Sequence, residues 1–345
     1  MLLAKGVPLA LGLAVALASC GGAQPSRRTV WPGSAATHPG RGPGHLSVAT
    51  STSVLALNVL IAQSDGRLVS VSPRGQVVWR KRQIDPTQVF VTRTGRTLLV
   101  TEADRSVMTM RRVDSGAVSY VYGRADQAGA RNNHLDDPQT AAETANGLIA
   151  IADLGNCRVL LVTPSSNRPR ETLGERGICV HHVNSPPITL AHPDAALPVA
   201  GGALVVTERR PAWIDVFGAS GALRTALELH GIRAPSDANG YGADDIVVAE
   251  QTDPGDVIEL SARSGRVLWS YGPRAGPGEL DRPTIARVLA NGDVLVADTG
   301  NDRVIVIAPR TKMIVWQYGH THVPGSRPGY LDAPTSATPV PLGGA

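Results

Sequence analysis

The chain has 345 residues, of which 33 are basic and 29 acidic, so its formal net charge is +4. Hydrophobic residues make up 42% and charged residues 18%, which allows a buried core and excludes disordered, collagen-like and polytopic membrane proteins. The charge is spread along the chain without a basic block, which argues against nucleic-acid binding. With 37 glycines and 26 prolines, many turns are expected in place of long helices, so the composition favours a β-rich fold.

Residues 1–19 have the features of a signal peptide. Lys5 precedes an apolar run from Val7 to Ala18, which is short for a membrane span. The run ends in Leu-Ala-Ser-Cys at residues 17–20, which resembles the lipobox of bacterial lipoproteins. The resemblance implies that Cys20 is lipidated and that the mature protein is anchored to the cell membrane on its extracytoplasmic side. The alternative is an ordinary secretory signal in which Cys20 is incidental.

The anchor is followed by a segment of different composition. Residues 20–44 are rich in glycine and proline and are expected to form a flexible tether. The remainder, residues 45–345, is expected to form the folded domain.

An apolar strand ending in Asp, Glu or Gln recurs through this domain. Its six copies end about 47 residues apart on average. Each copy is followed by two further β-runs and preceded by one, and four short strands at this period are typical of a propeller blade. We therefore predict an all-β, six-bladed β-propeller with four strands in each blade. The copies are residues 58–63, 97–102, 148–153, 203–208, 246–250 and 294–298.

The two ends of the domain are expected to meet. Residues 331–344 repeat the beginning of a blade, and the strands that this blade lacks occur at residues 58–80. We predict that the C-terminal strand completes the first blade and leaves no open sheet edge. Seven blades, with residues 46–57 contributing to another sheet, are the alternative.

Two units carry a longer shared motif. Residues 146–159 and 291–304 both read Asn-Gly, five mostly apolar residues, and then Asp-x-Gly-Asn-x-Arg-Val, and they resemble NHL repeats. The third strand of several units ends in Trp, which resembles the PQQ-like propeller repeat. No vicinal cysteine pair or Ca²⁺ cage accompanies this pattern, so no cofactor is predicted. Asp153 with Arg158, and Asp298 with Arg303, recur in equivalent positions, which favours a structural pairing that fixes a turn over a catalytic role.

Two cysteines are left after Cys20. In an exported protein, Cys157 and Cys179 form an even pair, so a disulfide is expected. A metal site and a catalytic thiol are the alternatives.

The histidines gather in the connections between predicted blades, which emerge on one face around the channel. NHL-type propellers include an amidating lyase with a histidine-bound Zn²⁺, and this resemblance implies a candidate ligand-binding surface. No histidine lies in a metal-ligand motif, so no metal site is assigned. The loop of residues 237–245 resembles a Ca²⁺ loop, but a turn between two strands of the fifth unit is preferred. The candidate histidines are His134, His181, His182, His230, His320 and His322.

No catalytic residue is assigned, because no single-copy catalytic motif is present. The favoured function is a monomeric, lipid-anchored binding or scaffold module for an envelope protein, peptide or glycan. The alternative is a metal-assisted lyase or hydrolase at the channel mouth. That enzyme requires at least three of four histidines to converge, whereas a binding module predicts that they are scattered. The four are His134, His182, His320 and His322.

Overall fold

The computed structural model describes residues 55–82, 85–184, 186–241 and 244–340. The predicted signal peptide, the predicted lipidation site at Cys20 and the predicted tether lie outside the described residues. Within the described residues, no helix has both the length and the apolar character needed to span a membrane.

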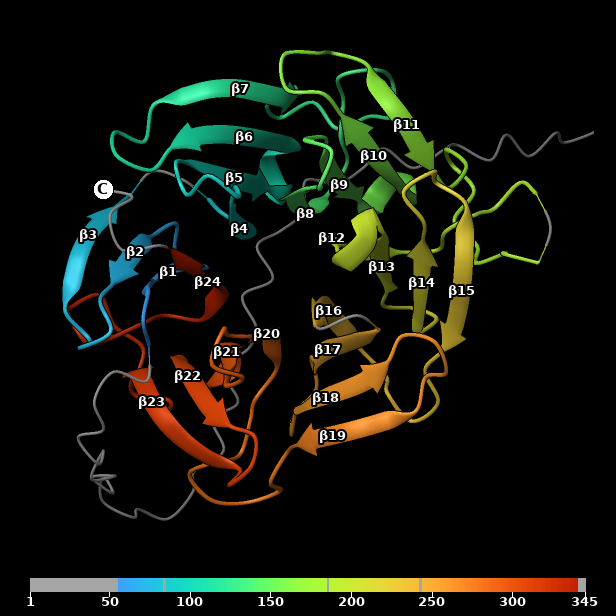
Figure 1. Ribbon diagram of the computed structural model, residues 1–345. Coiled ribbons are helices and arrows are strands. Elements are labelled where there is room, and N and C mark those ends of the chain that lie inside the picture. The colour runs from blue at the N-terminus through green and yellow to red at the C-terminus, as the bar shows by residue number, and fades with distance from the viewer. Residues whose placement is uncertain (1–54, 83–84, 185, 242–243, 341–345) are drawn as a thin grey trace, which may run out of the picture. The chain divides into compact units, whose positions relative to one another are not determined.

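Six four-stranded antiparallel sheets are arranged as blades around a ring (Figure 1). This confirms the predicted all-β, six-bladed propeller. From the axis outward, the blades contain the following strands. Blade 1 has β24 (Pro334–Val340), β1 (Asn58–Gln63), β2 (Leu68–Val71) and β3 (Val77–Lys81). Blade 2 has β4 (Gln88–Val91), β5 (Thr97–Glu102), β6 (Val107–Arg112) and β7 (Val118–Gly123). Blade 3 has β8 (Pro138–Glu143), β9 (Ile149–Asp153), β10 (Arg158–Val162) and β11 (Pro169–Leu173).

The other three blades follow the same order. Blade 4 has β12 (Pro193–Pro198), β13 (Leu204–Glu208), β14 (Trp213–Phe217) and β15 (Leu223–Glu228). Blade 5 has β16 (Pro235–Tyr241), β17 (Asp245–Glu250), β18 (Asp256–Ser261) and β19 (Val267–Tyr271). Blade 6 has β20 (Pro283–Val288), β21 (Val294–Asp298), β22 (Arg303–Ala308) and β23 (Met313–Gly319). The described helices are four short 3-10 turns: η1 (Ala103–Arg105), η2 (Leu154–Asn156), η3 (Ala200–Gly202) and η4 (Thr299–Asn301).

The ring is closed by the two ends of the domain, as predicted. β24 pairs antiparallel with β1, from Asn58 opposite Val340 to Gln63 opposite Pro334. Figure 1 shows these strands, the first and the last of the described part of the chain, side by side in one blade. The alternative of seven blades is therefore wrong, because the described strands form six sheets.

The hydrophobic core lies between neighbouring blades. Of six clusters of buried side chains, five join residues of two adjacent sheets, and one joins residues of blades 2, 3 and 4. The second strand of a blade is covered on both faces, which explains why it is an unbroken apolar run; in β9 and β21 every residue is buried. The outer strands, such as β3, alternate between exposed and partly buried residues. Each blade therefore depends on both of its neighbours for its core.

The structure corrects one sequence prediction in blade 5. The turn expected at residues 237–245 begins later, because β16 continues through Tyr241. Asp237 is buried within this strand and accepts a hydrogen bond from Asn239. A Cβ at Gly240 would lie 2.4 Å from Cγ1 of Val199, so the glycine permits close packing between blades 4 and 5. Gly240 and the Asp237–Asn239 hydrogen bond thus belong to an inner strand, although these residue types are common in turns.

Side chains from several blades meet at the axis. The guanidinium of Arg287, on β20, lies 4.1 Å from the centre of the Phe90 ring on β4. Its Nη1 donates a hydrogen bond to Oγ1 of Thr338 on β24, at 2.8 Å. Arg287 therefore links three inner strands.

Candidate functional site

Blades 3 and 6 each contain a buried ion pair at the end of their second strand. In each blade the aspartate accepts a hydrogen bond from Nε of the arginine five residues later, at 2.7 Å, as seen for Asp153 with Arg158 and Asp298 with Arg303. The same carboxylates also accept hydrogen bonds from the Nδ2 groups of Asn156 and Asn301. Each aspartate thus organises the 3-10 turn that joins the second and third strands.

The arginines also reach the connection that leads into their own blade. Arg158 donates to the carbonyl oxygens of Ala130, at 2.9 Å, and His134, at 3.1 Å. Arg303 donates to the carbonyls of Pro277 and Glu279 in the same way. The pair therefore fixes the strand turn and the connection above it, which is a structural arrangement.

Blade 4 departs from this pattern. Glu208 ends β13, but its partner in the strand register is Trp213, where blades 3 and 6 have the arginine. Two residues further along β14, Asp215 lies opposite Val206, at the register position that Leu160 holds in blade 3. Blade 4 has thus lost the arginine and gained a second buried carboxylate.

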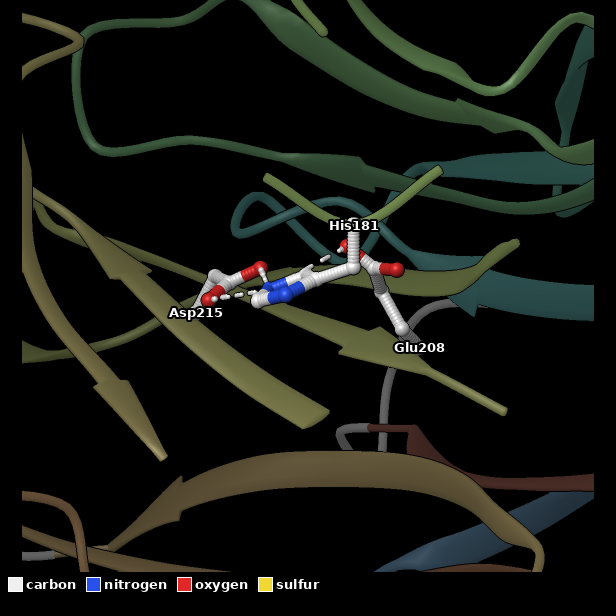
Figure 2. Close-up of side chains that lie close together, drawn as sticks. All are labelled: His181, Glu208 and Asp215. Atoms are coloured by element: carbon white, nitrogen blue, oxygen red, sulfur yellow. Dashed lines mark hydrogen bonds and ion pairs between the residues drawn. The ribbon is translucent and has the colours of Figure 1, made fainter. Parts of the chain in front are cut away.

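An imidazole from the preceding connection contacts both carboxylates. His181 stacks on the ring of Trp213, with centroids 4.1 Å apart. Its Nε2 lies 3.1 Å from Oδ2 of Asp215 and 3.9 Å from Oε1 of Glu208 (Figure 2). The exposed fractions of the three side chains are 7% for His181 and 0% for both acids. Among the described residues, this is the one group of three or more His, Cys, Asp or Glu side chains spaced to hold a metal ion.

The two carboxylate oxygens of Glu208 differ in their hydrogen bonding. Oε2 of Glu208 accepts a hydrogen bond from the backbone N–H of Ala191, at 2.7 Å. Oε1 is buried without a hydrogen-bond partner. Burial, followed by the neighbouring Asp215 carboxylate, raises the pKa of Glu208 to about 8. Two buried carboxyl groups thus lie side by side with His181 as their one ion-pair partner among the described residues, and Glu208 holds its proton more tightly than an exposed glutamic acid does.

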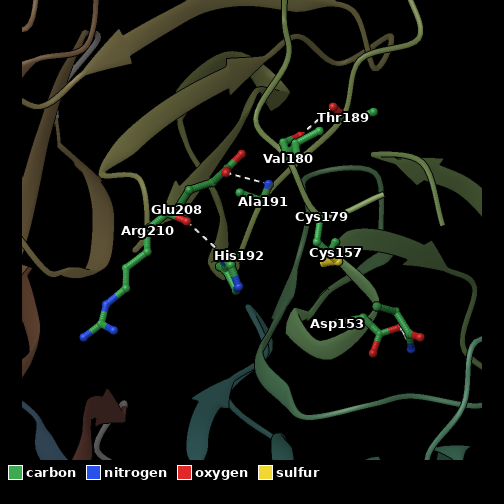
Figure 3. Close-up of a disulfide and its surroundings, with 10 residues drawn as sticks. Asp153, Cys157, Cys179, Val180, Thr189, Ala191, His192, Glu208 and Arg210 are labelled. Atoms are coloured by element: carbon green, nitrogen blue, oxygen red, sulfur yellow. Dashed lines mark hydrogen bonds between the residues drawn. A yellow bond between two sulfur atoms is a disulfide. The ribbon is translucent and has the colours of Figure 1, made fainter. Parts of the chain in front are cut away.

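A disulfide holds the connection that supplies the histidine (Figure 3). We call residues 174–192 the 3–4 connection, because they join blades 3 and 4; residue 185 lies outside the described residues. Cys157, just before β10, is bonded to Cys179, with Cα atoms 5.1 Å apart, so the predicted disulfide is present. On the other side of His181, the backbone N–H of His182 donates to the carbonyl of Thr189 at 3.1 Å, and the N–H of Thr189 donates back to the carbonyl of His182 at 2.9 Å. His181 is thus held within a backbone segment that is fixed at both ends.

Removing the disulfide is expected to lower the free energy of unfolding by about 3 kcal/mol, since the closed loop of 22 residues no longer restricts the unfolded chain. The variant is Cys157→Ala combined with Cys179→Ala; alanine suits the buried Cys157 position. Urea unfolding followed by circular dichroism measures the change. Wild-type protein under reducing conditions is the control and should match the variant. An unchanged midpoint in both samples would contradict the prediction.

The remaining candidate histidines do not join this group. His134 places Nδ1 3.1 Å from the carbonyl of Asn132, and the ring of His320 packs against Tyr330 at 4.3 Å. His182, His230 and His322 are exposed. In the described part of the chain, no three of the predicted histidines form a cluster. The histidine-only metal site considered at the channel mouth is therefore not formed by His134, His182, His320 and His322.

The sheet order defines a six-bladed β-propeller, and part of it is similar to the PQQ-like repeat family. A family model described as outer membrane protein assembly factor BamB matches residues 172–338, slightly less than half of the chain. No curated protein matches the sequence significantly. The fold and this match support a binding or scaffold module in general terms.

Solved structures show the same fold. A protein of unknown function from Bacteroides caccae has a TM-score of 0.57 and 18% identity, with 82% of this chain and 98% of that chain covered. A nidogen/laminin complex has a TM-score of 0.58 and 15% identity, with the same coverages of 82% and 98%. Virginiamycin B lyase from Staphylococcus aureus has a TM-score of 0.50 and 14% identity, with 77% and 85% covered. At these identities the similarity establishes the fold alone.

Proposed function

We propose that this protein is a lipid-anchored, extracytoplasmic propeller that binds a protein of the cell envelope through its 3–4 connection. The lipobox-like residues 17–20 support the anchor. A protein partner is supported by the family description, which names an outer membrane protein assembly factor. A free peptide or a glycan is the other class of ligand that the same surface could bind.

The observation that carries this proposal is a pair of exposed apolar side chains on a covalently held loop. Ile178 and Val180 flank the disulfide-bonded Cys179, and their exposed fractions are 40% and 58%. Exposed apolar side chains that lie together are typical of interaction surfaces. Because the disulfide already orders this backbone, a partner would lose less conformational entropy in binding it than in binding a mobile loop.

Site-specific photo-cross-linking tests the proposal. A photoreactive amino acid replaces Val180 in the full-length protein, expressed in its native envelope. The matched control carries it at Val118, which is 47% exposed on the outer strand β7. We expect a discrete cross-linked partner from position 180 and none from position 118. Equal labelling from both positions, or none from position 180, would refute a partner on the 3–4 connection.

The captured partner then allows a quantitative measurement. Changing Ile178 and Val180 to serine removes two apolar contacts, and we expect the affinity for the purified partner to fall at least about 10-fold. The control variant changes Val118 and Val121, which are similarly exposed on β7, and should leave the affinity unchanged. Binding that resists the first pair of changes would place the interface elsewhere on the propeller.

A metal-assisted lyase or hydrolase at the channel mouth requires at least three of His134, His182, His320 and His322 to converge. These residues form no such cluster among the described residues. One of the similar structures is a lyase, but at 14% identity it supports the fold alone.

A further inference from the structure

We propose that His181, Glu208 and Asp215 bind a divalent transition-metal ion, most simply Zn²⁺, inside blade 4. One imidazole nitrogen and two carboxylate oxygens are a ligand set that Zn²⁺ accepts in proteins. The three side chains come from three segments: the 3–4 connection, β13 and β14. A bound ion would therefore tie the connection to the sheet beneath it.

Charge balance is the first argument. In blades 3 and 6, each buried aspartate at the end of the second strand has an arginine at 2.7 Å. In blade 4 two fully buried carboxylates share a single imidazole. The nearby Arg209 is bonded to a different carboxylate, that of Asp194. Buried charges need a counter-charge or a metal, so a dication supplies what the lost arginine supplies elsewhere.

The spacing of the ligand atoms is the second argument. Nε2 of His181 and one oxygen of each carboxylate all lie within 4.8 Å of one another. Ligands at about 2.0–2.2 Å from a tetrahedral Zn²⁺ are themselves roughly 3.3 Å apart. The distance of 3.1 Å from Nε2 of His181 to Asp215 is close to this spacing. The distance of 3.9 Å from Nε2 to Glu208 reaches it after a small movement of the Glu208 side chain.

The atoms around the site hold the ligands in place. The N–H of Ala191 binds Oε2 of Glu208, which leaves the buried Oε1, without a hydrogen-bond partner, directed toward His181. The Trp213 ring supports one face of the imidazole (Figure 2 shows the three ligands). Such outer contacts orient the ligands of metal sites. Three protein ligands leave one coordination position for water.

A shared proton is the competing explanation. Glu208 and Asp215 could balance their charge by holding one proton between them, as closely spaced carboxyl groups do. The two explanations differ in a measurable way, because only the metal site takes up an ion with fixed stoichiometry.

Metal binding to the full-length chain in detergent tests the proposal. The protein is stripped with a chelator, and Zn²⁺ binding is followed by titration calorimetry and elemental analysis. We expect one equivalent of Zn²⁺ per chain. Asp215→Leu, which introduces the residue that blade 3 has at this register position, and Asp215→Asn should each weaken binding at least about 100-fold. His192→Ala is the matched control, because His192 lies in the same connection with its Nδ1 2.8 Å from the carbonyl of Arg210, and it should keep full binding.

Co²⁺ provides a second measurement that does not depend on stability. Its visible absorption should report low-symmetry coordination in the wild type and lose that signature in His181→Gln, while far-ultraviolet circular dichroism shows that the variant is folded. No stoichiometric uptake by the wild type would overturn the metal site in favour of the shared proton. Unchanged uptake by folded Asp215→Leu would overturn it in favour of adventitious binding. These measurements use no partner protein. A negative result would therefore count against the metal site and leave the proposed binding of an envelope protein untouched.

Discussion

Replacing Arg303 with methionine is expected to lower the free energy of unfolding by about 3–5 kcal/mol. Arg303 is only 1% exposed, and its Nε donates to Asp298 at 2.7 Å. It also donates to the carbonyls of Pro277, at 2.9 Å, and Glu279, at 2.8 Å. The variant therefore leaves a buried carboxylate without its counter-charge and two carbonyls without a donor. Urea unfolding at neutral pH measures the loss.

Two controls separate this effect from loss of packing. Adding Asp298→Asn to Arg303→Met removes the buried charge, so the double variant should be more stable than the single variant. Arg112→Met breaks an ion pair with Asp114 in which the side chains are 62% and 46% exposed, and it should lower the free energy of unfolding far less than Arg303→Met does. Equal losses for Arg303→Met and Arg112→Met would contradict the assigned role of burial.

The pH dependence of Arg303→Met has a definite sign. Burial raises the pKa of Asp298, and Arg303 is the largest influence opposing that rise. Without Arg303 the folded-state pKa rises further, so the folded variant binds a proton more tightly than the unfolded chain does. The free energy of unfolding of Arg303→Met should therefore come closer to that of the wild type as the pH falls through the raised pKa of Asp298 toward the ordinary value of 3.8. A deficit that grows on acidification would show that the buried charge is not its cause.

The fold could be predicted from the sequence because its signal is repeated. Six apolar strands that each end in Asp, Glu or Gln indicate the number of blades. The strand missing from the first blade indicates how the ring closes. The prediction was wrong where local composition misled it. Residues 237–241 have a turn-like sequence, but their backbone pairs with β17, and the glycine at position 240 permits the close approach of Val199.

The three-residue group in blade 4 could not be predicted in the same way. His181 was one of six candidate histidines, and nothing in its local sequence distinguishes it from His182. What places it beside Glu208 and Asp215 is the path of the 3–4 connection, which depends on the disulfide and on stacking with Trp213. One sequence signal did exist. Asp215 is an acidic residue at the position that Leu160 holds in blade 3 and Ile305 in blade 6. The missing arginine is not itself distinctive, because Val107 and Asp256 take its position in blades 2 and 5.

Ending the chain after Tyr330 is expected to abolish cooperative folding, with a loss greater than about 5 kcal/mol, the low end of the stability of natural domains. The truncation removes β24, the inner strand of blade 1, and leaves β1 with an unpaired edge. It also removes contacts to both neighbouring blades. Ser336 and Thr338 donate to the carbonyl of Val89 on β4, at 3.0 and 2.7 Å, and Thr284 on β20 donates to the carbonyl of Thr335, at 3.1 Å.

Rescue in trans distinguishes ring closure from a general effect of shortening the chain. A synthetic peptide of residues 331–345 should restore a cooperative transition, because it supplies β24 and the buried Leu331 and Ala337. A control peptide with proline at positions 336 and 338 lacks backbone donors in the strand and should not restore it. Differential scanning calorimetry of the truncated chain with each peptide makes the comparison. If the truncated chain alone unfolds at the wild-type temperature, then pairing of β24 with β1 is not what holds the propeller closed.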